Sequence, residues 1–344
     1  MATTFKTLVL DKDVANTRTL LHEAIPLTGT IVSGTYADEN IKNYAHGMFQ
    51  SVYDYPYLSS SANHIFDLTV GYSANSGLSG TASVQNSKKI NIYNQMAQVL
   101  VGYDLTGSIR EFDQDGNLAA GGAKLQECLF VNFSRLLTKD EVKKGSFIMT
   151  ALTGGTPAAP TDALTISDYG AASTYLTNSP AGEYAPLYTS SATPNATSGV
   201  GLLYYQAGIA VLTASVFDGT FGAPAATYDT SSIDAVLTGS QISSSCDGIR
   251  NRWQDCDFNN TTELNSTIYF CRAASNEFNY SSNPTYLSGS KIRVKSESTD
   301  PPSSFITSIG LYSEDNELLA VAKVSEPLKK DPSTELTLRV RLDY

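Results

Sequence analysis

The chain of 344 residues has few of the residue types that build catalytic and metal centres. It contains three histidines, one tryptophan and four cysteines, which are Cys128, Cys246, Cys256 and Cys271. The cysteines lie far apart and lack the paired spacing of a zinc site, so we expect four free thiols. A disulfide from Cys256 to Cys246 or to Cys271 is the alternative. The sequence predicts no metal site and no cofactor.

Charge is also scarce. Charged residues make up 17% of the chain, and the net charge is -11. A negative protein is poorly suited to nucleic acid, which needs clustered Lys and Arg, or to an anionic membrane. No stretch approaches the roughly 18 apolar residues that span a bilayer, and Met1–Leu10 shows no secretory signal. We therefore expect no direct nucleic-acid partner and no membrane association. The expected free thiols fit assembly in a reducing cytoplasm.

Lys and Arg are absent between Gly145 and Ile249, where seven acidic residues remain. This segment is rich in Gly, Ala and Thr and contains the most apolar run of the chain, Gly201–Phe217. The run is short for a membrane span, and its Gly, Tyr and Gln residues fit buried strands better. Such a segment indicates packing, either inside the fold or against a symmetry mate. We hypothesise that the region 150–250 fills an interface between subunits.

Sequence motifs of known catalytic chemistry are missing. The chain has no Walker loop, no G-x-G-x-x-G and no G-x-S-x-G. We predict that it is not an enzyme, and we assign no catalytic, cofactor-binding or metal-binding residue.

Two polar groups are candidates for chemistry. His64 and Asp67 are spaced as a base and its orienting acid, but no nucleophile motif accompanies them, so a structural histidine is preferred. Asp113-x-Asp115-Gly116-Asn117 resembles the start of a calcium loop but lacks the later ligands, so a hairpin turn is preferred. The weaker candidates are His22 with Glu23, and His46.

Tyrosine is abundant, with 20 residues. Two clusters, Tyr53/Tyr55/Tyr57 and Tyr204/Tyr205, are candidates for sugar-binding platforms. Packing in a core or an interface is the preferred interpretation, because tyrosine supplies a large apolar face with one polar tip.

Local patterns predict an α+β region in the first 150 residues. Strands are expected at Ala2–Leu10, Ile65–Tyr72, Ser108–Phe112, Leu125–Phe133 and Gly145–Thr150. Helices are expected after a cap at Asp38, with an apolar stripe of Ile41, Tyr44, Ala45, Met48 and Phe49, and over Ser87–Val101. A capping box at Thr138–Glu141 predicts one further helical turn.

The last forty residues predict antiparallel sheet. Phe305–Tyr312 and Leu318–Val324 flank the polar turn Ser313–Glu317. Glu335–Tyr344 then alternates apolar and polar residues, as a strand with one buried face does. We hypothesise that this C-terminal part supplies or receives a strand by β-augmentation.

Together these patterns predict an α+β protein that is predominantly β, with antiparallel sheets or a β-sandwich and two or three short helices. Three regions are expected: an α+β assembly domain (1–150), a charge-poor Gly/Ala/Ser/Thr-rich β region (151–249), and a C-terminal β region (250–344) that ends in a three-strand antiparallel unit.

Several stretches resemble virion structural proteins of tailed bacteriophages, notably of the marine and cyanophage types. They are Asn63–Tyr72, Tyr93–Gln98, Gly201–Phe217 and Ile306–Tyr312, the last followed by an acidic turn and Glu-Leu-Leu-Ala-Val-Ala-Lys. The resemblance covers about a third of the chain and implies a part of the tail, baseplate or neck, present in repeated copies in the virion. It implies neighbouring virion proteins and further copies of the chain as partners.

Two alternatives stay open. One is a capsid decoration or scaffolding protein, and the other is a receptor-binding or carbohydrate-binding tail protein.

Overall fold

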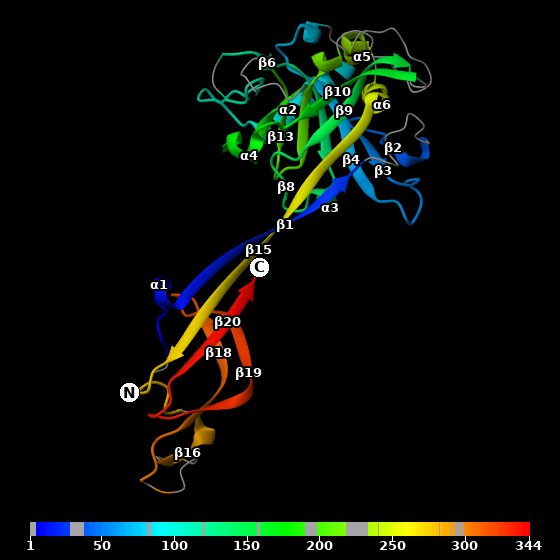
Figure 1. Ribbon diagram of the computed structural model, residues 1–344. Coiled ribbons are helices and arrows are strands. Elements are labelled where there is room, and N and C mark those ends of the chain that lie inside the picture. Colours follow the sequence, from blue (N-terminus) through cyan, green and yellow to red (C-terminus); the bar gives the residue numbers. More distant parts are fainter. Residues whose placement is uncertain are drawn as a thin grey trace. The chain divides into compact units, whose positions relative to one another are not determined.

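Figure 1 shows the protein as a computed structural model, which is predominantly β, with antiparallel strands and six α-helical segments in its described part. The predicted fold class is confirmed. The structure describes residues 5–27, 38–80, 84–118, 121–156, 159–189, 198–217, 233–239, 241–281, 283–289, 291–292, 297 and 299–344.

The chain forms two compact units. Unit 1 consists of Met1–Leu20 and Glu263–Tyr344, and unit 2 consists of Leu21–Thr262. Two strands, β1 (Val14–Pro26) and β15 (Trp253–Ala273), contribute residues to both units. These boundaries differ from the three regions expected from composition. Residue composition changes along the sequence, whereas the units are held together by pairing between strands from the two ends of the chain.

Unit 2 contains most of the elements. Its further strands are β2 (Ile41–Asn43), β3 (Gln50–Tyr53), β4 (His64–Tyr72), β5 (Phe112–Asp113), β6 (Lys124–Leu125), β7 (Glu127–Phe133), β8 (Glu141–Val142), β9 (Ile148–Thr156), β10 (Ala159–Ser167), β11 (Leu176–Ser179), β12 (Gly182–Tyr188), β13 (Gly199–Tyr204) and β14 (Ile209–Thr213). Its helices are α2 (Val84–Leu100), α3 (Arg135–Thr138), α4 (Ala171–Thr174), α5 (Ile233–Gly239) and α6 (Ile242–Arg252). One antiparallel sheet runs in the order β15-β9-β10-β12-β13-β14-β7-β4-β3-β2.

The core of unit 2 lies on both faces of β4 and β7. On one face Phe66 stacks on Trp253, with ring centroids 4.8 Å apart. On the other face α2 packs closely: Tyr93 meets Phe130 edge to face, and a Cβ on Gly71 would lie 2.6 Å from the carbonyl oxygen of Lys89. Because both faces are covered, these strands are apolar throughout rather than alternating.

Several predicted elements are present. The strand at 65–72 is β4, the helix at 87–101 is α2, and the run Gly201–Phe217 forms the hairpin β13–β14 followed by a 3-10 turn. Leu202, Leu203 and Leu212 are completely buried in the core of unit 2. The hairpin therefore packs inside the fold, the first of the two interpretations of this segment. The hypothesis that the region 150–250 fills an interface between subunits stays a prediction.

The helix predicted from Asp38 to Phe49 is wrong. Asp38–Asn40 forms one 3-10 turn, Ile41–Asn43 is β2, and Gly47 adopts a left-handed φ of 61° in the following turn. The apolar residues pair with β3 or pack as a cluster of Tyr44, His46 and Phe49 rings. Pairing to the edge of the sheet overrides the helical spacing, as tertiary context often does.

Three predicted elements near the ends of strands also differ. The strand Ala2–Leu10 is absent over Phe5–Val9, which leads into the single turn α1 (Leu10–Asp13), and the rest of it lies outside the described residues. Thr138 ends helix α3 instead of opening one, because Lys139 has a φ of 56° and Glu141–Val142 pairs with β15. The strand expected at Ser108–Phe112 is reduced to β5, which pairs with β6.

Unit 1 consists of α1, parts of β1 and β15, and the C-terminal strands. The short strands β16 (Leu287–Ser288) and β17 (Lys291–Ile292) pair, and β18 (Ser304–Tyr312) and β19 (Leu318–Lys330) form the predicted hairpin. Strand β20 (Leu336–Asp343) pairs with β15 over eight residues, from Ser266–Asp343 to Ala273–Leu336. The expected three-strand C-terminal unit is therefore a two-stranded hairpin plus a strand of the large sheet, and β20 is used within its own chain.

Candidate functional site

The structure brings His64 and Asp67 together, as their spacing allowed. His64 Nε2 lies 2.8 Å from Asp67 Oδ1, and the same oxygen accepts a hydrogen bond of 2.5 Å from the buried Ser51 hydroxyl. A nucleophilic serine needs its hydroxyl against the imidazole, with the carboxylate behind the ring. Here the carboxylate stands between them, so the group ties β3 to β4 and gives serine no base.

The Asp113–Asn117 segment forms a turn at the start of the connection between β5 and β6, closed by a hydrogen bond from the Gly116 N–H to the Asp113 carbonyl. Asp113 is buried and forms an ion pair with Lys124 across the β5–β6 pair, and Gly116 has a φ of 74°. Asn117 donates to Asp115 at 2.6 Å, so the turn is closed by its own side chains. Its resemblance to a calcium loop thus reflects turn chemistry, since the buried carboxylate already has a cation beside it.

The weaker candidates lie in structural contacts. His22 contacts Asn260 and Thr261 across the β1–β15 pair, and His46 stacks on Tyr44 with ring centroids 5.1 Å apart. Tyr204 and Tyr205 are completely buried, so they offer no platform to a sugar. The four cysteines are free thiols, as predicted.

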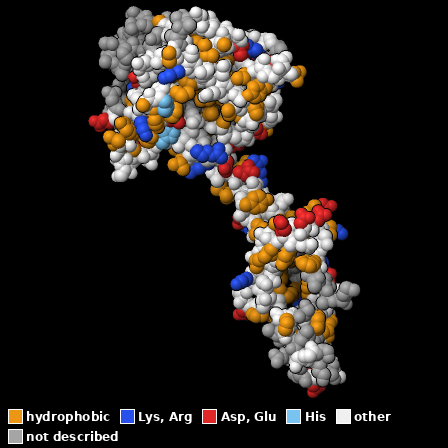
Figure 2. Space-filling view, turned by 180° about the vertical axis from the view of Figure 1, so that it is seen from behind, with side chains coloured by type: hydrophobic (Ala, Val, Ile, Leu, Met, Phe, Trp, Pro, Cys, Tyr) orange, Lys and Arg blue, Asp and Glu red, His pale blue; other side chains and the backbone are white. Residues whose placement is uncertain are grey.

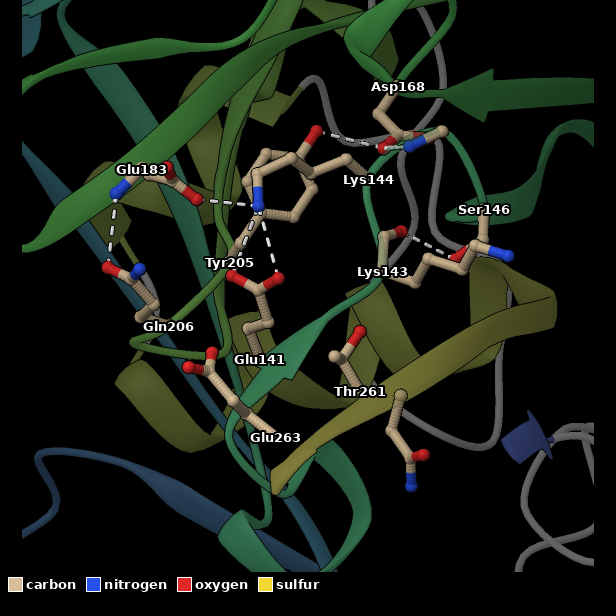
Figure 3. A network of polar contacts seen from close by, with 12 residues as sticks. Glu141, Lys143, Lys144, Ser146, Asp168, Glu183, Tyr205, Gln206, Thr261 and Glu263 are labelled. Carbon is tan, nitrogen blue, oxygen red and sulfur yellow. Dashed lines mark hydrogen bonds and ion pairs between the residues drawn. The ribbon is translucent and has the colours of Figure 1, made fainter. Parts of the chain in front are cut away.

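A half-buried polar network surrounds Lys144 in unit 2 (Figure 3). Its ammonium group lies 2.5 Å from Glu183 Oε2 and 3.1 Å from Glu141, and it stands over the rings of Tyr175 and Tyr205. Burial works to lower the pKa of Lys144, but the ion pairs with the two carboxylates outweigh it and raise the pKa. The raised pKa favours the charged form of this lysine, and its ion pairs join β8 to β12.

Asp168 extends the same network. It accepts hydrogen bonds from the backbone N–H of Gly145 at 2.6 Å and of Phe147 at 3.0 Å, and from the Tyr205 hydroxyl at 2.9 Å. Burial nevertheless raises the pKa of its carboxyl to about 6. Three hydrogen-bond donors converge on this carboxylate and fix the loop before β9. Both carboxylate oxygens therefore already have partners.

These contacts also neutralise the segment without Lys and Arg. Glu183 pairs with Lys144, and Asp247 pairs with Arg250 at 2.9 Å. Both cations come from residues just outside the segment. The negative charge of this region is therefore compensated inside unit 2 at these two positions.

Unit 1 is built differently, because it has almost no apolar core. Ala273 and Val340 are its only buried hydrophobic residues in the described part of the chain. Hydrogen bonds and an ion pair stabilise it instead. The completely buried Lys330 donates hydrogen bonds to oxygens of Ser275, Asn279 and Asp331. Asp13, also buried, pairs with Arg272 at 3.1 Å. A unit held in this way has little apolar burial to stabilise it.

Apolar side chains of unit 1 lie at its surface instead. The unit holds fewer than a third of the residues but half of the large hydrophobic side chains that the structure describes as exposed. These are Phe5, Val9, Leu10, Leu20, Leu264, Tyr280, Phe305, Tyr312, Leu318, Leu319, Val321 and Tyr344. Figure 2 shows hydrophobic side chains exposed over both units. Exposed apolar surface on this scale is typical of a binding interface.

The densest group lies on one face of the β18–β19 hairpin. We call the hairpin face the surface formed by Tyr312, Leu318, Val321 and Lys323 around Gly310. Cross-strand pairs place these side chains on the same side: Gly310 opposite Val321, and Tyr312 opposite Leu318. A Cβ on Gly310 would lie 2.8 Å from the Tyr312 ring, so the glycine lets that ring lie flat across the strand.

The residues that surround the hairpin face extend it. Phe5 meets Tyr312 edge on, with ring centroids 5.5 Å apart, and is 61% exposed. Leu319, at the irregular end of the hairpin, is 69% exposed. The opposite face, with Ile309, Leu311 and Ala322, is half-buried. The hairpin thus has one face against its own unit and an apolar face toward solvent.

Comparison with protein-family models, curated proteins and solved structures finds no match for this chain. Within the described residues no group of three or more His, Cys, Asp or Glu side chains could hold a metal ion. No helix in that part of the chain is long and apolar enough to cross a membrane.

A partial signal for the hairpin face is present in the sequence. The run Phe305–Val324 alternates imperfectly, with Leu318 and Leu319 adjacent and Gly310 in the middle of a strand. An isolated Gly in a strand indicates close approach by another group, and two adjacent apolar residues cannot both face one core. Both features can be recognised in the sequence. Which side of the hairpin faces solvent cannot be predicted from it.

Proposed function

We propose that the chain is a structural subunit of a tailed-phage virion, in the tail, baseplate or neck, where it contacts copies of itself and neighbouring virion proteins. The observation that carries the assembly role is that, among the described residues of unit 1, very few apolar side chains are buried and many are exposed. A unit of this kind gains stability when another protein covers it. The sequence resemblance supplies the phage part of the proposal.

The stretches that carry the resemblance support two roles in such a subunit. Asn63–Tyr72, Tyr93–Gln98 and Gly201–Phe217 lie in β4, α2 and β13–β14, which build the core of unit 2. Ile306–Tyr312 lies in β18 and includes part of the hairpin face. The first three fit a stable body, and the last fits a surface that joins neighbours.

One observation favours a second candidate, a carbohydrate-binding tail protein. A hollow of about 320 Å³ in unit 2 is lined by amide, aromatic and cationic side chains, among them Asn43, Tyr44, Gln85, Lys88 and Gln241. Aromatic rings next to amide groups suit the apolar and polar faces of a sugar. This candidate predicts that isolated protein binds a sugar and that Tyr44→Ala abolishes the binding.

The proposal is tested by labelling purified phage particles with an antibody to this chain and viewing them by electron microscopy. Label at the neck, tail or baseplate is the expected result. Label over the head would indicate capsid decoration, and label on distal fibres would favour the receptor role. Mass spectrometry of the same particles is the control, because a chain absent from the particle proteins contradicts a virion role.

A further inference from the structure

Building on the proposed assembly role, we propose that the hairpin face binds the hairpin face of a second copy of this chain, antiparallel about a two-fold axis that passes near Gly310 and Val321. The face combines apolar side chains with a particular order of charges along the hairpin. That order is what identifies the occupant.

The charges lie at opposite ends of the hairpin face. Lys323 is exposed and stands opposite Ser308, two pairs from the Gly310–Val321 pair. On the other side, beyond the Tyr312–Leu318 pair, the turn carries exposed acidic residues, Glu314, Asp315 and Glu317. The middle is therefore uncharged, with Lys323 on one side of it and the acidic turn on the other.

A half-turn about the middle exchanges the two ends. It brings Lys323 of each copy to the acidic turn of the other, which makes two equivalent contacts between opposite charges. An interface that uses the same patch on both subunits requires such self-complementarity. Parallel stacking of two copies would instead bring like charges together, which disfavours association.

The middle of the face is shaped for close approach. Gly310 has no side chain, Ser308 is small, and the Tyr312 ring lies across the strand rather than standing up from it. Two such sheets can stack at the spacing of about 10 Å that is usual for packed sheets. Leu318 and Val321, both more than half exposed in one copy, would then be covered by the other.

Net charge makes this arrangement specific. Each chain has a net charge of -11, so two copies repel each other at long range. Contacts between opposite charges at the interface are therefore needed to select one orientation. A partner of different sequence would have to carry the same inverted order of Lys and acidic residues, whereas a second copy carries it by symmetry.

Sedimentation velocity of the full-length chain tests the proposal with two charge reversals, Lys323→Glu and Glu317→Lys. The wild-type chain is expected to form a dimer. Each variant alone places like charges together twice, so we expect its dissociation constant to rise by at least about tenfold. An equal mixture of the two variants restores both contacts and is expected to recover the wild-type affinity.

Apolar burial is tested with Val321→Glu, which should abolish the dimer. Its matched control is Leu105→Glu, because Leu105 in unit 2 is fully exposed and lies outside the hairpin face. Circular dichroism checks that every variant folds as the wild type does.

A wild-type chain that stays monomeric up to its solubility limit would overturn the proposal, as would a mixture of variants no stronger than either variant alone. A trimer or larger ring would overturn the two-fold arrangement. If the chain is monomeric but Val321→Glu fails to enter particles, a different virion protein covers the face and the second-copy proposal is again overturned. Antibody labelling of particles is independent of these results, so the assembly role and the dimer can fail separately.

Discussion

At the scale of single residues, Gly71 shows how one missing side chain positions a helix. A Cβ at this position would lie 2.6 Å from Lys89 O and 2.8 Å from Tyr93 N, both backbone atoms of α2 that cannot move aside alone. We expect Gly71→Ala to lower the free energy of unfolding by about 1–3 kcal/mol, the usual cost of overpacking. Urea unfolding measures this change.

Gly77→Ala is the control for that prediction. A Cβ on Gly77 would meet nothing within 4 Å, so the expected change in the free energy of unfolding is about 0.5 kcal/mol or less. Equal effects of the two substitutions would contradict the close packing of α2 on β4.

Asp168 predicts a pH dependence of stability. The pKa of its carboxyl is about 6 in the folded protein because of burial, against about 3.9 in an unfolded chain. The folded state therefore holds the proton more tightly, so this group's contribution to stability is full below about pH 4 and is lost as the pH rises through 6. The difference between the folded and unfolded pKa values corresponds to about 3 kcal/mol in the free energy of unfolding.

The measurement compares wild type with Asp168→Asn. The asparagine cannot titrate, so the stability of the wild type relative to the variant should fall between pH 4 and pH 7. Unfolding curves that stay parallel across this range would show that the carboxyl of Asp168 has an ordinary pKa. Asp11→Asn, at an exposed position, serves as the control for general charge effects.

The sequence was informative about residue contacts where local spacing decides them. The pairing of His64 with Asp67 and the closed turn at Asp113–Asn117 both involve neighbours in the chain. The contact of Lys144 with Glu183 was not predictable, because it depends on β8 and β12 meeting in the folded unit. Sequence distance alone says nothing about that meeting.

At the scale of elements, the Lys144 network predicts how β8 and β12 are joined. Lys144→Met would leave Glu141 and Glu183 close together without their cation. We expect a loss of about 2 kcal/mol in the free energy of unfolding, less than for a fully buried pair because the side chains are partly solvated. Thermal or urea unfolding measures the loss.

A double variant gives this prediction its control. Adding Glu183→Gln to Lys144→Met removes the repulsion between the two carboxylates and should recover part of the lost stability. If the double variant is no more stable than Lys144→Met, the effect arises from packing on Tyr175 and Tyr205 rather than from charge.

Elements with a strong pattern were predictable and those without one were not. Strand β4, helix α2 and the hairpins β13–β14 and β18–β19 follow their sequence patterns because their packing faces match them. Strands β1 and β15 were missed, since β1 is largely exposed and β15 alternates only over Asp255–Asn259, a small part of its length. The helix predicted at Asp38–Phe49 is wrong for a different reason: its apolar residues have helical spacing, but strand pairing overrides that spacing.

At the scale of the whole molecule, the two units should differ in stability. Unit 2 has an extensive apolar core. Unit 1 is stabilised by hydrogen bonds and ion pairs and has two buried apolar residues within its described part. We expect unit 1 to open at a free energy several kcal/mol below that of unit 2, and to be stabilised by increasing protein concentration if copies associate.

Two probes separate the units in one experiment. Trp253, the only tryptophan, is buried in the core of unit 2, so its fluorescence reports that unit. Far-ultraviolet circular dichroism reports strands of both. The circular dichroism signal should begin to change at a lower denaturant concentration than the fluorescence, and coincident curves would indicate a single cooperative molecule.

The fold class followed from composition and periodicity, but the division into units did not. Unit 1 is assembled from both ends of the chain, and no local pattern marks Leu20 or Thr262 as a boundary. Such a division depends on pairing between residues more than two hundred positions apart.

The continuity of β15 has a consequence for how the gene can vary. Its residues up to Thr262 belong to unit 2 and those from Glu263 onward to unit 1, with no loop at the boundary to absorb a change in length. Because side chains alternate along a strand, one inserted codon there would turn every later residue of β15 to the opposite side, and two would restore the order. Natural length variation in this strand should therefore come in pairs of codons.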